Sequence, residues 1–207
     1  MNQATSGLRN RNLRTVLALA AIFLLPLVAS FWLYYGAAWR PSGRTNHGEL
    51  IDPARPLPGV VLRVRMVTRP DGSGQGDLRS NLFLGRWSLV YVAPEPCAAD
   101  CRRALYVMRQ TRLALNNDMT RVQRVWLATA GCCEEPSLAQ EHAGLLLADA
   151  HTDAAAALLA RFPADAHATS VFVVDPNGNL MMRYDARRNP RGLLDDLRKL
   201  LQLSHIG

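Results

Sequence analysis

The feature that most constrains this chain of 207 residues is a run without a charged side chain, from Thr15 to Trp39. Its 25 residues exceed the roughly 20 that a helix needs to cross the hydrocarbon layer of a bilayer. The apolar region of a cleaved signal peptide is shorter, at about 7–15 residues. Aromatic residues gather near the end of the run, as they do where a helix meets the lipid headgroups. The run predicts a single transmembrane anchor, residues 15–39.

The charges on either side of the anchor predict its orientation. Residues 1–14 carry three arginines and no acid, whereas the basic residues after the anchor are soon followed by Glu49 and Asp52. Because Lys and Arg stay on the cytoplasmic side, we expect residues 1–14 in the cytoplasm and the rest of the chain outside. Arginine outnumbers lysine 23 to one, which is typical of a GC-rich bacterial genome. We therefore expect a single-pass protein of the bacterial inner membrane, with its C-terminal domain in the periplasm.

The formal net charge of +7 does not predict binding to nucleic acid. Residues 40–207 hold 21 basic and 17 acidic side chains, and the basic ones are scattered along the chain without interleaved aromatic residues. Nucleic-acid-binding domains instead gather their basic side chains on one face. We expect a mildly basic, solvated surface and no nucleic-acid partner.

Beyond the anchor, the sequence predicts a linker followed by one domain. Residues 40–58 contain four prolines and no helical period, which indicates an extended linker. Residues 59–207 alternate between strand and helix patterns and end in a hairpin, marked by Asn177-Gly178, and a final helix. The main predicted elements are strands at 59–67, 87–92 and 122–128, a helix at 102–116, the hairpin at 170–185 and the last helix at 191–203. This order predicts an α/β thioredoxin-like sandwich with a mixed central sheet whose first strand pair is parallel.

Two cysteines, Cys97 and Cys101, stand where the strand 87–92 passes into the next helix. The start of a helix favours thiolate over thiol, and the four-residue spacing places both sulfurs on one face. A thiolate pair selects Cu(I), zinc or an iron–sulfur cluster, and the same pair can close a disulfide. The pair is therefore a metal site, a redox couple or a structural bridge, and a bridge over so short a loop constrains the unfolded chain little.

A Cu(I) site with two thiolates needs a third ligand, and one of the five histidines is suitably placed. His167 ends a loop immediately before the predicted buried strand 170–174. In the predicted topology this loop faces the start of the helix that carries the cysteines. We expect His47, in the linker, and His205, in the tail, to face solvent and to be inert. We expect His142 and His151 to lie in or beside surface helices without a functional role.

A second cysteine pair, Cys132 and Cys133, follows the strand 122–128. Because parallel strands end at the same rim of a sheet, we expect this pair on the same side as Cys97. It can supply extra soft ligands or exchange disulfides with the first pair. It can equally have no role, since adjacent cysteines match no metal-binding spacing.

The sequence around these residues resembles the SCO/SenC family, the copper-binding thioredoxin-like proteins of cytochrome c oxidase assembly. The shared pattern is a strand, C-x-x-x-C, a helix, and a histidine eight residues before Asp-Pro-x-Gly, carried here by Cys97, Cys101, His167 and residues 175–178. The resemblance covers about residues 85–203, and the family also has one N-terminal membrane helix. Where the family usually has a proline after each cysteine, this chain has Ala98 and Arg102, which indicates a divergent branch.

The resemblance implies that Cys97, Cys101 and His167 hold copper as Cu(I), and that the partner is the copper-bearing subunit of cytochrome c oxidase. It favours a copper carrier over an enzyme. The alternative is a thiol–disulfide oxidoreductase that keeps the oxidase cysteines reduced, in which Cys97, expected to be the more exposed, attacks and Cys101 resolves. A third alternative is a non-catalytic assembly protein.

Overall fold

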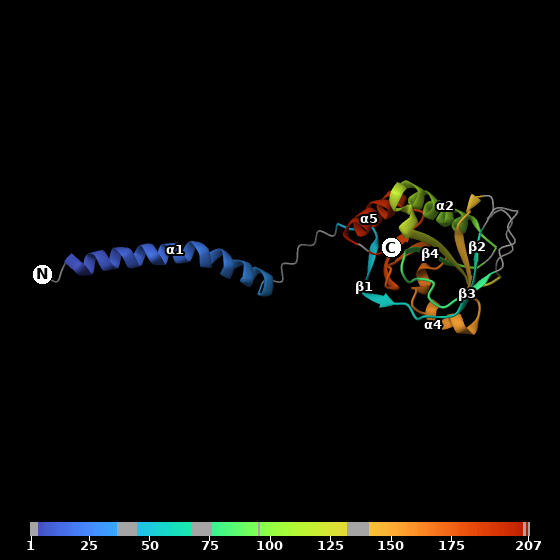
Figure 1. Cartoon of the computed structure of the whole chain (residues 1–207), viewed down its shortest axis with the longest axis horizontal. Helices are drawn as coiled ribbons and strands as arrows, with labels where there is room; N and C mark the ends of the chain where they lie inside the picture. Colours follow the sequence, from blue (N-terminus) through green and yellow to red (C-terminus); the bar gives the residue numbers. More distant parts are fainter. Residues whose placement is uncertain are drawn as a thin grey trace. The chain divides into compact units, whose positions relative to one another are not determined.

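The computed structural model describes residues 4–36, 45–67, 76–94, 96–131, 141–204 and 206 (Figure 1). The chain divides into two compact units, residues 1–44 and residues 45–207. Of the elements that the structure describes, the first unit contains one helix and the second contains all the strands.

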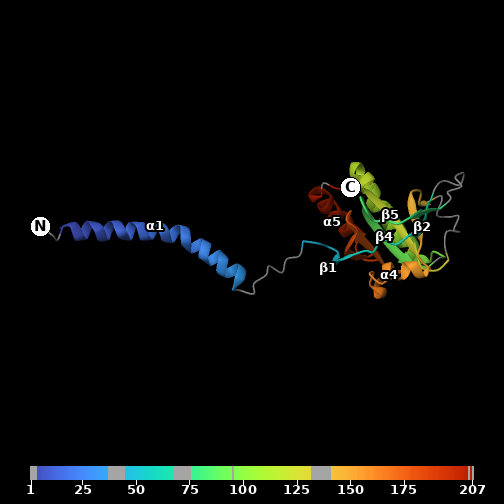
Figure 2. The same cartoon turned by 60° about the horizontal axis from the view of Figure 1, so that its bottom comes forward.

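The helix of the first unit, α1 (Ala4–Tyr35), agrees with the predicted anchor over the residues that the structure describes. Its section Leu13–Tyr35 spans 23 residues and is long and apolar enough to cross a membrane. Figure 2 shows that α1 bends, and Pro26 lies inside it. Proline is tolerated in membrane-spanning helices, where it produces a kink of this kind. Residues 37–39 of the predicted span lie outside the described residues.

The second unit is built on one sheet of eight strands in the order β1-β8-β7-β4-β5-β6-β2-β3. The strands are β1 (Glu49–Pro56), β2 (Leu62–Met66), β3 (Asp77–Arg79), β4 (Trp87–Ala93), β5 (Val122–Ala128), β6 (Leu145–Asp149), β7 (Ser170–Val174) and β8 (Asn179–Asp185). The helices with described bounds are α2 (Ala99–Ala114), α4 (Ala156–Leu159) and α5 (Pro190–Leu203), with short 3-10 helices η1 (Asn116–Arg121), η2 (Asp153–Ala155) and η3 (Ala164–Ala166).

The central strands β4, β5 and β6 are parallel to one another, and the other described pairs are antiparallel. The predicted parallel first pair is confirmed, because β4 runs beside β5 from Trp87 opposite Val122 to Ala93 opposite Ala128. Every residue of β4 is buried, as expected for a strand that is paired on both edges and covered on both faces. The carboxyl end of β4 therefore lies at the same rim as the amino end of its antiparallel neighbour β7.

Helices cover both faces of this sheet (Figure 1). One apolar cluster joins Tyr91 of β4 to Leu105 of α2 and Leu197 of α5. A second cluster, on the opposite face, joins Val92 of β4 to Leu158 of α4. Successive strand residues alternate between the two clusters because their side chains point to opposite faces. The predicted α/β sandwich with a mixed central sheet is confirmed.

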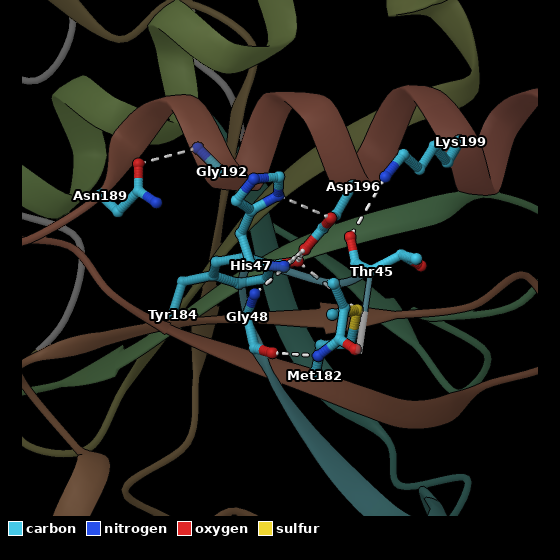
Figure 3. Close-up of polar contacts among 10 residues, drawn as sticks. Thr45, His47, Gly48, Met182, Tyr184, Asn189, Gly192, Asp196 and Lys199 are labelled. Carbon is cyan, nitrogen blue, oxygen red and sulfur yellow. Dashed lines mark hydrogen bonds and ion pairs between the residues drawn. The ribbon is translucent and has the colours of Figure 1, made fainter. Parts of the chain in front are cut away.

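The edge of the sheet differs from the prediction for residues 40–58. Residues 49–56 of the expected linker form β1, which pairs antiparallel with β8. Just before β1, the backbone N–H groups of His47 and Gly48 donate to Oδ2 of Asp196 at 2.7 and 3.0 Å (Figure 3). The ordered domain therefore begins well before residue 59.

His47 is exposed, as expected, but it also has partners in α5, which the sequence did not predict. Its Nδ1 lies 3.1 Å from Oδ1 of Asp196 (Figure 3). Its β-carbon packs so closely on Gly192 that a β-carbon at residue 192 would lie only 2.5 Å from it. Glycine at this position lets the chain before β1 lie directly on the first turn of α5.

The predicted hairpin is present in β7 and β8, but its turn is built differently. Pro176 and Asn177 are the central residues, because the N–H of Gly178 donates to the carbonyl of Asp175 at 3.0 Å. Gly178 follows with a φ of 82°. Proline at the first central position favours a type I turn, and a left-handed glycine after such a turn gives a three-residue hairpin loop.

Candidate metal and redox site

The cysteine pair lies at the start of α2, which begins at Ala99. Cys97 stands just before the N-cap residue, Ala98, and Cys101 lies in the first turn. The two cysteines are joined by a disulfide with their Cα atoms 5.2 Å apart. Their exposed fractions are 4% and 3%, so Cys97 is not the more exposed residue that we expected. In this state the pair is a buried disulfide.

Arg102 takes part in the local structure of the cysteine pair. Its Nη1 donates to the carbonyl oxygen of Cys97 at 2.8 Å. Its backbone N–H donates to the carbonyl of Ala98 at 3.0 Å. A proline lacks both donors, so these two bonds exist only because this chain departs from the family pattern at residue 102.

His167 follows η3 and its side chain is half-buried. Burial lowers the pKa of His167, although a hydrogen bond to the Phe162 backbone and the negative charge of Asp165 act in the opposite direction. Its Nε2 is buried and has no hydrogen-bond partner among the residues that the structure describes. The ring is therefore neutral at neutral pH, with one nitrogen oriented by the backbone and the other unengaged. Metal-binding histidines are commonly held in this way.

The loop that carries His167 is fastened to the end of β4 that leads to the cysteines. The N–H of Ala168 donates to the carbonyl of Val92 at 2.7 Å, and the hydroxyl of Tyr91 donates to the carbonyl of Ala168 at 2.9 Å. The next carbonyl along β4, that of Ala93, accepts from Nε1 of Trp126 at 3.0 Å. These bonds fix the last three residues of β4, a few residues before Cys97.

The predicted set of three ligands is not assembled in this state. Among the described residues, no group of three or more His, Cys, Asp or Glu side chains is placed to hold a metal ion. Cys97 and Cys101 are bonded to each other, and a disulfide offers no thiolate to a metal. Their role with His167 stays a prediction for the reduced protein. Cys132 and Cys133 lie outside the described residues.

The other histidines are held elsewhere. His142 is buried, with an exposed fraction of 4%, although we expected it at the surface, and its Nε2 lies 4.0 Å from a carboxylate oxygen of Glu141. Nδ1 of His151 contacts the carboxylate of Asp149. His205 lies outside the described residues.

Sequence reasoning missed two residues that shape the His167 loop. Tyr91 entered the prediction only as part of an apolar run, although its hydroxyl was a sign of a specific hydrogen-bond partner. Ala168 has a φ of 60°, a left-handed conformation that is uncommon for a residue with a β-carbon. No local sequence pattern predicts that conformation for an alanine, so the sequence around Ala168 gave no sign of it.

The mixed sheet covered by helices, with a cysteine pair at a strand-to-helix junction, defines a thioredoxin-like protein. Residues 87–204 match the model of the family described as "Transmembrane-like, thioredoxin-like, C-terminal domain", and the chain belongs to this family. No curated protein sequence matches the chain.

Solved structures of Sco proteins share this fold. Yeast Sco1 with copper bound superposes with a TM-score of 0.54 at 15% identity, covering 72% of this chain and 96% of that one. Arabidopsis thaliana ScoI with copper bound has a TM-score of 0.51 at 13% identity, and the match covers 70% of this chain and 97% of that one. Apo Sco1 of Thermus thermophilus has a TM-score of 0.50 at 17% identity, and the match covers 77% of this chain and 99% of that one. The predicted resemblance to the SCO/SenC family is confirmed for the fold.

Proposed function

We propose that the protein is a membrane-anchored, Sco-like copper-binding protein that assists assembly of the copper centre of cytochrome c oxidase. In its reduced state, Cys97 and Cys101 are thiolate ligands and His167 is the imidazole ligand of one Cu(I). The observation that carries this proposal is the buried, unpartnered Nε2 of His167, in a loop fastened to the strand that leads to Cys97. The shared fold with Sco proteins that have copper bound supports it.

Copper is the cargo in this proposal, and the disulfide controls its loading. Reduction of the Cys97–Cys101 bond takes two electrons and two protons from an external dithiol and yields two thiols. Cu(I) then displaces the protons as the thiolates bind. Soft thiolate ligands favour Cu(I) over harder ions. Release follows by ligand exchange with cysteine thiolates on the copper-bearing subunit of the oxidase.

The proposed location follows from α1 and the charges around it. Leu13–Tyr35 is long and apolar enough to span a membrane, and the arginines before it favour a cytoplasmic N-terminus. We place residues 1–14 in the cytoplasm, the helix in a bacterial inner membrane and the thioredoxin-like domain in the periplasm. A reporter fused after Gly207 tests this. A reporter that works only after export should be active in this fusion. Activity of a reporter that works only in the cytoplasm would contradict the orientation.

Anaerobic titration of the reduced, full-length protein in detergent with Cu(I), against a chromophoric Cu(I) chelator, tests the copper site. We expect one Cu(I) per chain, bound more weakly by Cys97→Ser, Cys101→Ser and His167→Ala. X-ray absorption should show two sulfur ligands and one nitrogen ligand. His151→Ala is the matched control, because that exposed histidine pairs with Asp149. Unchanged stoichiometry and affinity in Cys97→Ser would place the ion elsewhere.

The Cys97–Cys101 disulfide favours a second candidate, a thiol–disulfide oxidoreductase. In that reaction one thiolate of the reduced pair attacks a target disulfide, and the other resolves the mixed disulfide. The target gains two thiols and the pair returns to its disulfide. The similar burial of the two cysteines marks neither as the attacking one. If the Cys97→Ser, Cys101→Ser double variant supports oxidase assembly fully, the protein is instead a non-catalytic assembly factor.

A further inference from the structure

Ala168, the residue after the proposed ligand His167, has an unusual backbone conformation. Its φ of 60° is in the left-handed region. Among the described residues, the only others with a positive φ are Asn116 and four glycines. Asparagine and glycine tolerate that region, whereas an alanine is held there against its own preference. Such conformations persist only when the surroundings impose them, and they cluster at functional sites.

Two consecutive residues of β4 impose this conformation, one on each side of the alanine. The carbonyl of Val92 accepts the N–H of Ala168 at 2.7 Å. The hydroxyl of Tyr91 donates to the Ala168 carbonyl at 2.9 Å. The backbone of a central strand cannot easily move, so the Val92 contact is a fixed point. The Tyr91 contact, in contrast, comes from a side chain, so a single substitution can remove it.

Tyr91 is itself rigidly held. Its exposed fraction is 0%, and it belongs to the cluster that packs under α2 and α5. Its ring lies 6.4 Å from that of Trp126. Burial, together with the charge of Asp100, raises the pKa of Tyr91 far above its usual value. The hydroxyl therefore keeps its proton and acts as a donor.

We propose that Tyr91 is a positioning residue for His167. Its hydroxyl holds Ala168 in the left-handed conformation, and this conformation sets the direction in which the preceding imidazole presents Nε2. If Ala168 relaxes to an ordinary conformation, the peptide that joins it to His167 rotates. The ring then loses its contact with the Phe162 backbone and its half-buried place. The inference rests on the proposed role of His167 as a copper ligand.

The proposal makes a specific prediction about two substitutions together. Tyr91→Phe removes the hydroxyl and leaves the aromatic ring, so Ala168 is free to relax. Ala168→Gly removes the β-carbon that makes the left-handed conformation unfavourable. The effect of Tyr91→Phe on copper binding should therefore be large when residue 168 is alanine and small when it carries the Ala168→Gly substitution.

The test is a double-mutant cycle on the reduced, full-length protein in detergent, with Cu(I) affinity read by competition with a chelator. We expect Tyr91→Phe to weaken binding by roughly threefold to tenfold, the range for one lost hydrogen bond. We expect the same substitution to have little effect in the Ala168→Gly background. X-ray absorption should show a reduced nitrogen contribution only in Tyr91→Phe. Tyr106→Phe, on the exposed surface of α2, is the control.

Thermal unfolding of all four proteins separates positioning from loss of stability. Tyr91→Phe should lower the unfolding temperature in both backgrounds, whereas copper affinity should fall in one only. If the double variant binds copper as weakly as Tyr91→Phe, Tyr91 does not act through Ala168 and the inference is wrong. If Tyr91→Phe binds normally while His167→Ala is weakened, the inference fails and the copper site stands. If neither changes affinity, His167 is not a ligand and the proposed function itself fails.

Discussion

The carboxylate of Asp196 in α5 accepts the backbone N–H of His47 at 2.7 Å, although the two residues are 149 positions apart in the sequence. The same oxygen accepts from the N–H of Gly48 and from the hydroxyl of Tyr184, at 3.0 and 2.8 Å (Figure 3). Burial alone would raise the pKa of Asp196, but these hydrogen bonds hold it below its usual value. An ionised carboxylate thus fastens the residues before β1 to α5.

Asp196→Ala should therefore destabilise the domain. The substitution leaves the N–H groups of His47 and Gly48 and the Tyr184 hydroxyl without their acceptor, and one unsatisfied buried polar group costs about 1–3 kcal/mol. Denaturant unfolding of the wild-type and variant proteins measures the loss. Asp195→Ala, at the exposed neighbouring position, is the matched control. Equal losses in the two variants would show that the Asp196 contacts contribute nothing specific.

The same carboxylate predicts a pH dependence. Because the pKa of Asp196 is lower in the folded protein than the value of about 3.9 for an unfolded chain, its contribution is fully present above about pH 4. The contribution is lost as the pH falls through the folded-state pKa. The gap in unfolding free energy between wild type and Asp196→Ala should therefore be wider at pH 6 than at pH 3. A gap that does not change with pH would mean that the pKa of Asp196 is not lowered in the folded protein.

Arg183 of β8 links β1 to the loop that leads to His167. It donates to both carboxylate oxygens of Glu49, at 2.8 and 3.0 Å, and to Asp165 at 3.0 Å. Because exposed ion pairs are screened by water and contribute little, Arg183→Ala should destabilise the domain less than Asp196→Ala does. Denaturant unfolding in low and high salt checks this, since any loss should shrink in high salt. A larger loss than that of Asp196→Ala would contradict the ranking.

The centre of the sheet was predictable, whereas its edge was not. Strands 87–93 and 122–128 are buried on both faces, and such strands show as unbroken apolar runs. β1 has no such run, and its two prolines, Pro53 and Pro56, are typical of a linker. Proline is nevertheless tolerated in an edge strand, where only one side of the backbone is paired. What orders this segment is a set of contacts with distant residues, which local sequence does not reveal.

In the candidate site, too, some features could be predicted from the sequence and others could not. Cys97, Cys101 and His167 stand out in the sequence because few side chains carry thiolate or imidazole chemistry. The contacts that set the geometry of the His167 loop involve the backbone of Ala168 and the hydroxyl of Tyr91, 77 residues away. A backbone angle leaves no trace in the identity of an alanine. The sequence therefore points to the candidate residues, whereas the contacts that position them required the structure.

His167 separates the two leading functions in cells. A copper carrier needs the imidazole, because two thiolates alone leave Cu(I) readily exchangeable, whereas a thiol–disulfide reductase needs only Cys97 and Cys101. We expect His167→Ala to impair cytochrome c oxidase assembly nearly as much as Cys97→Ser, and added copper to restore it in part. Oxidase activity and haem spectra of membranes measure the outcome, with His151→Ala as the control. Normal assembly with His167→Ala, together with failure in Cys101→Ser, would reject the copper carrier and leave the reductase.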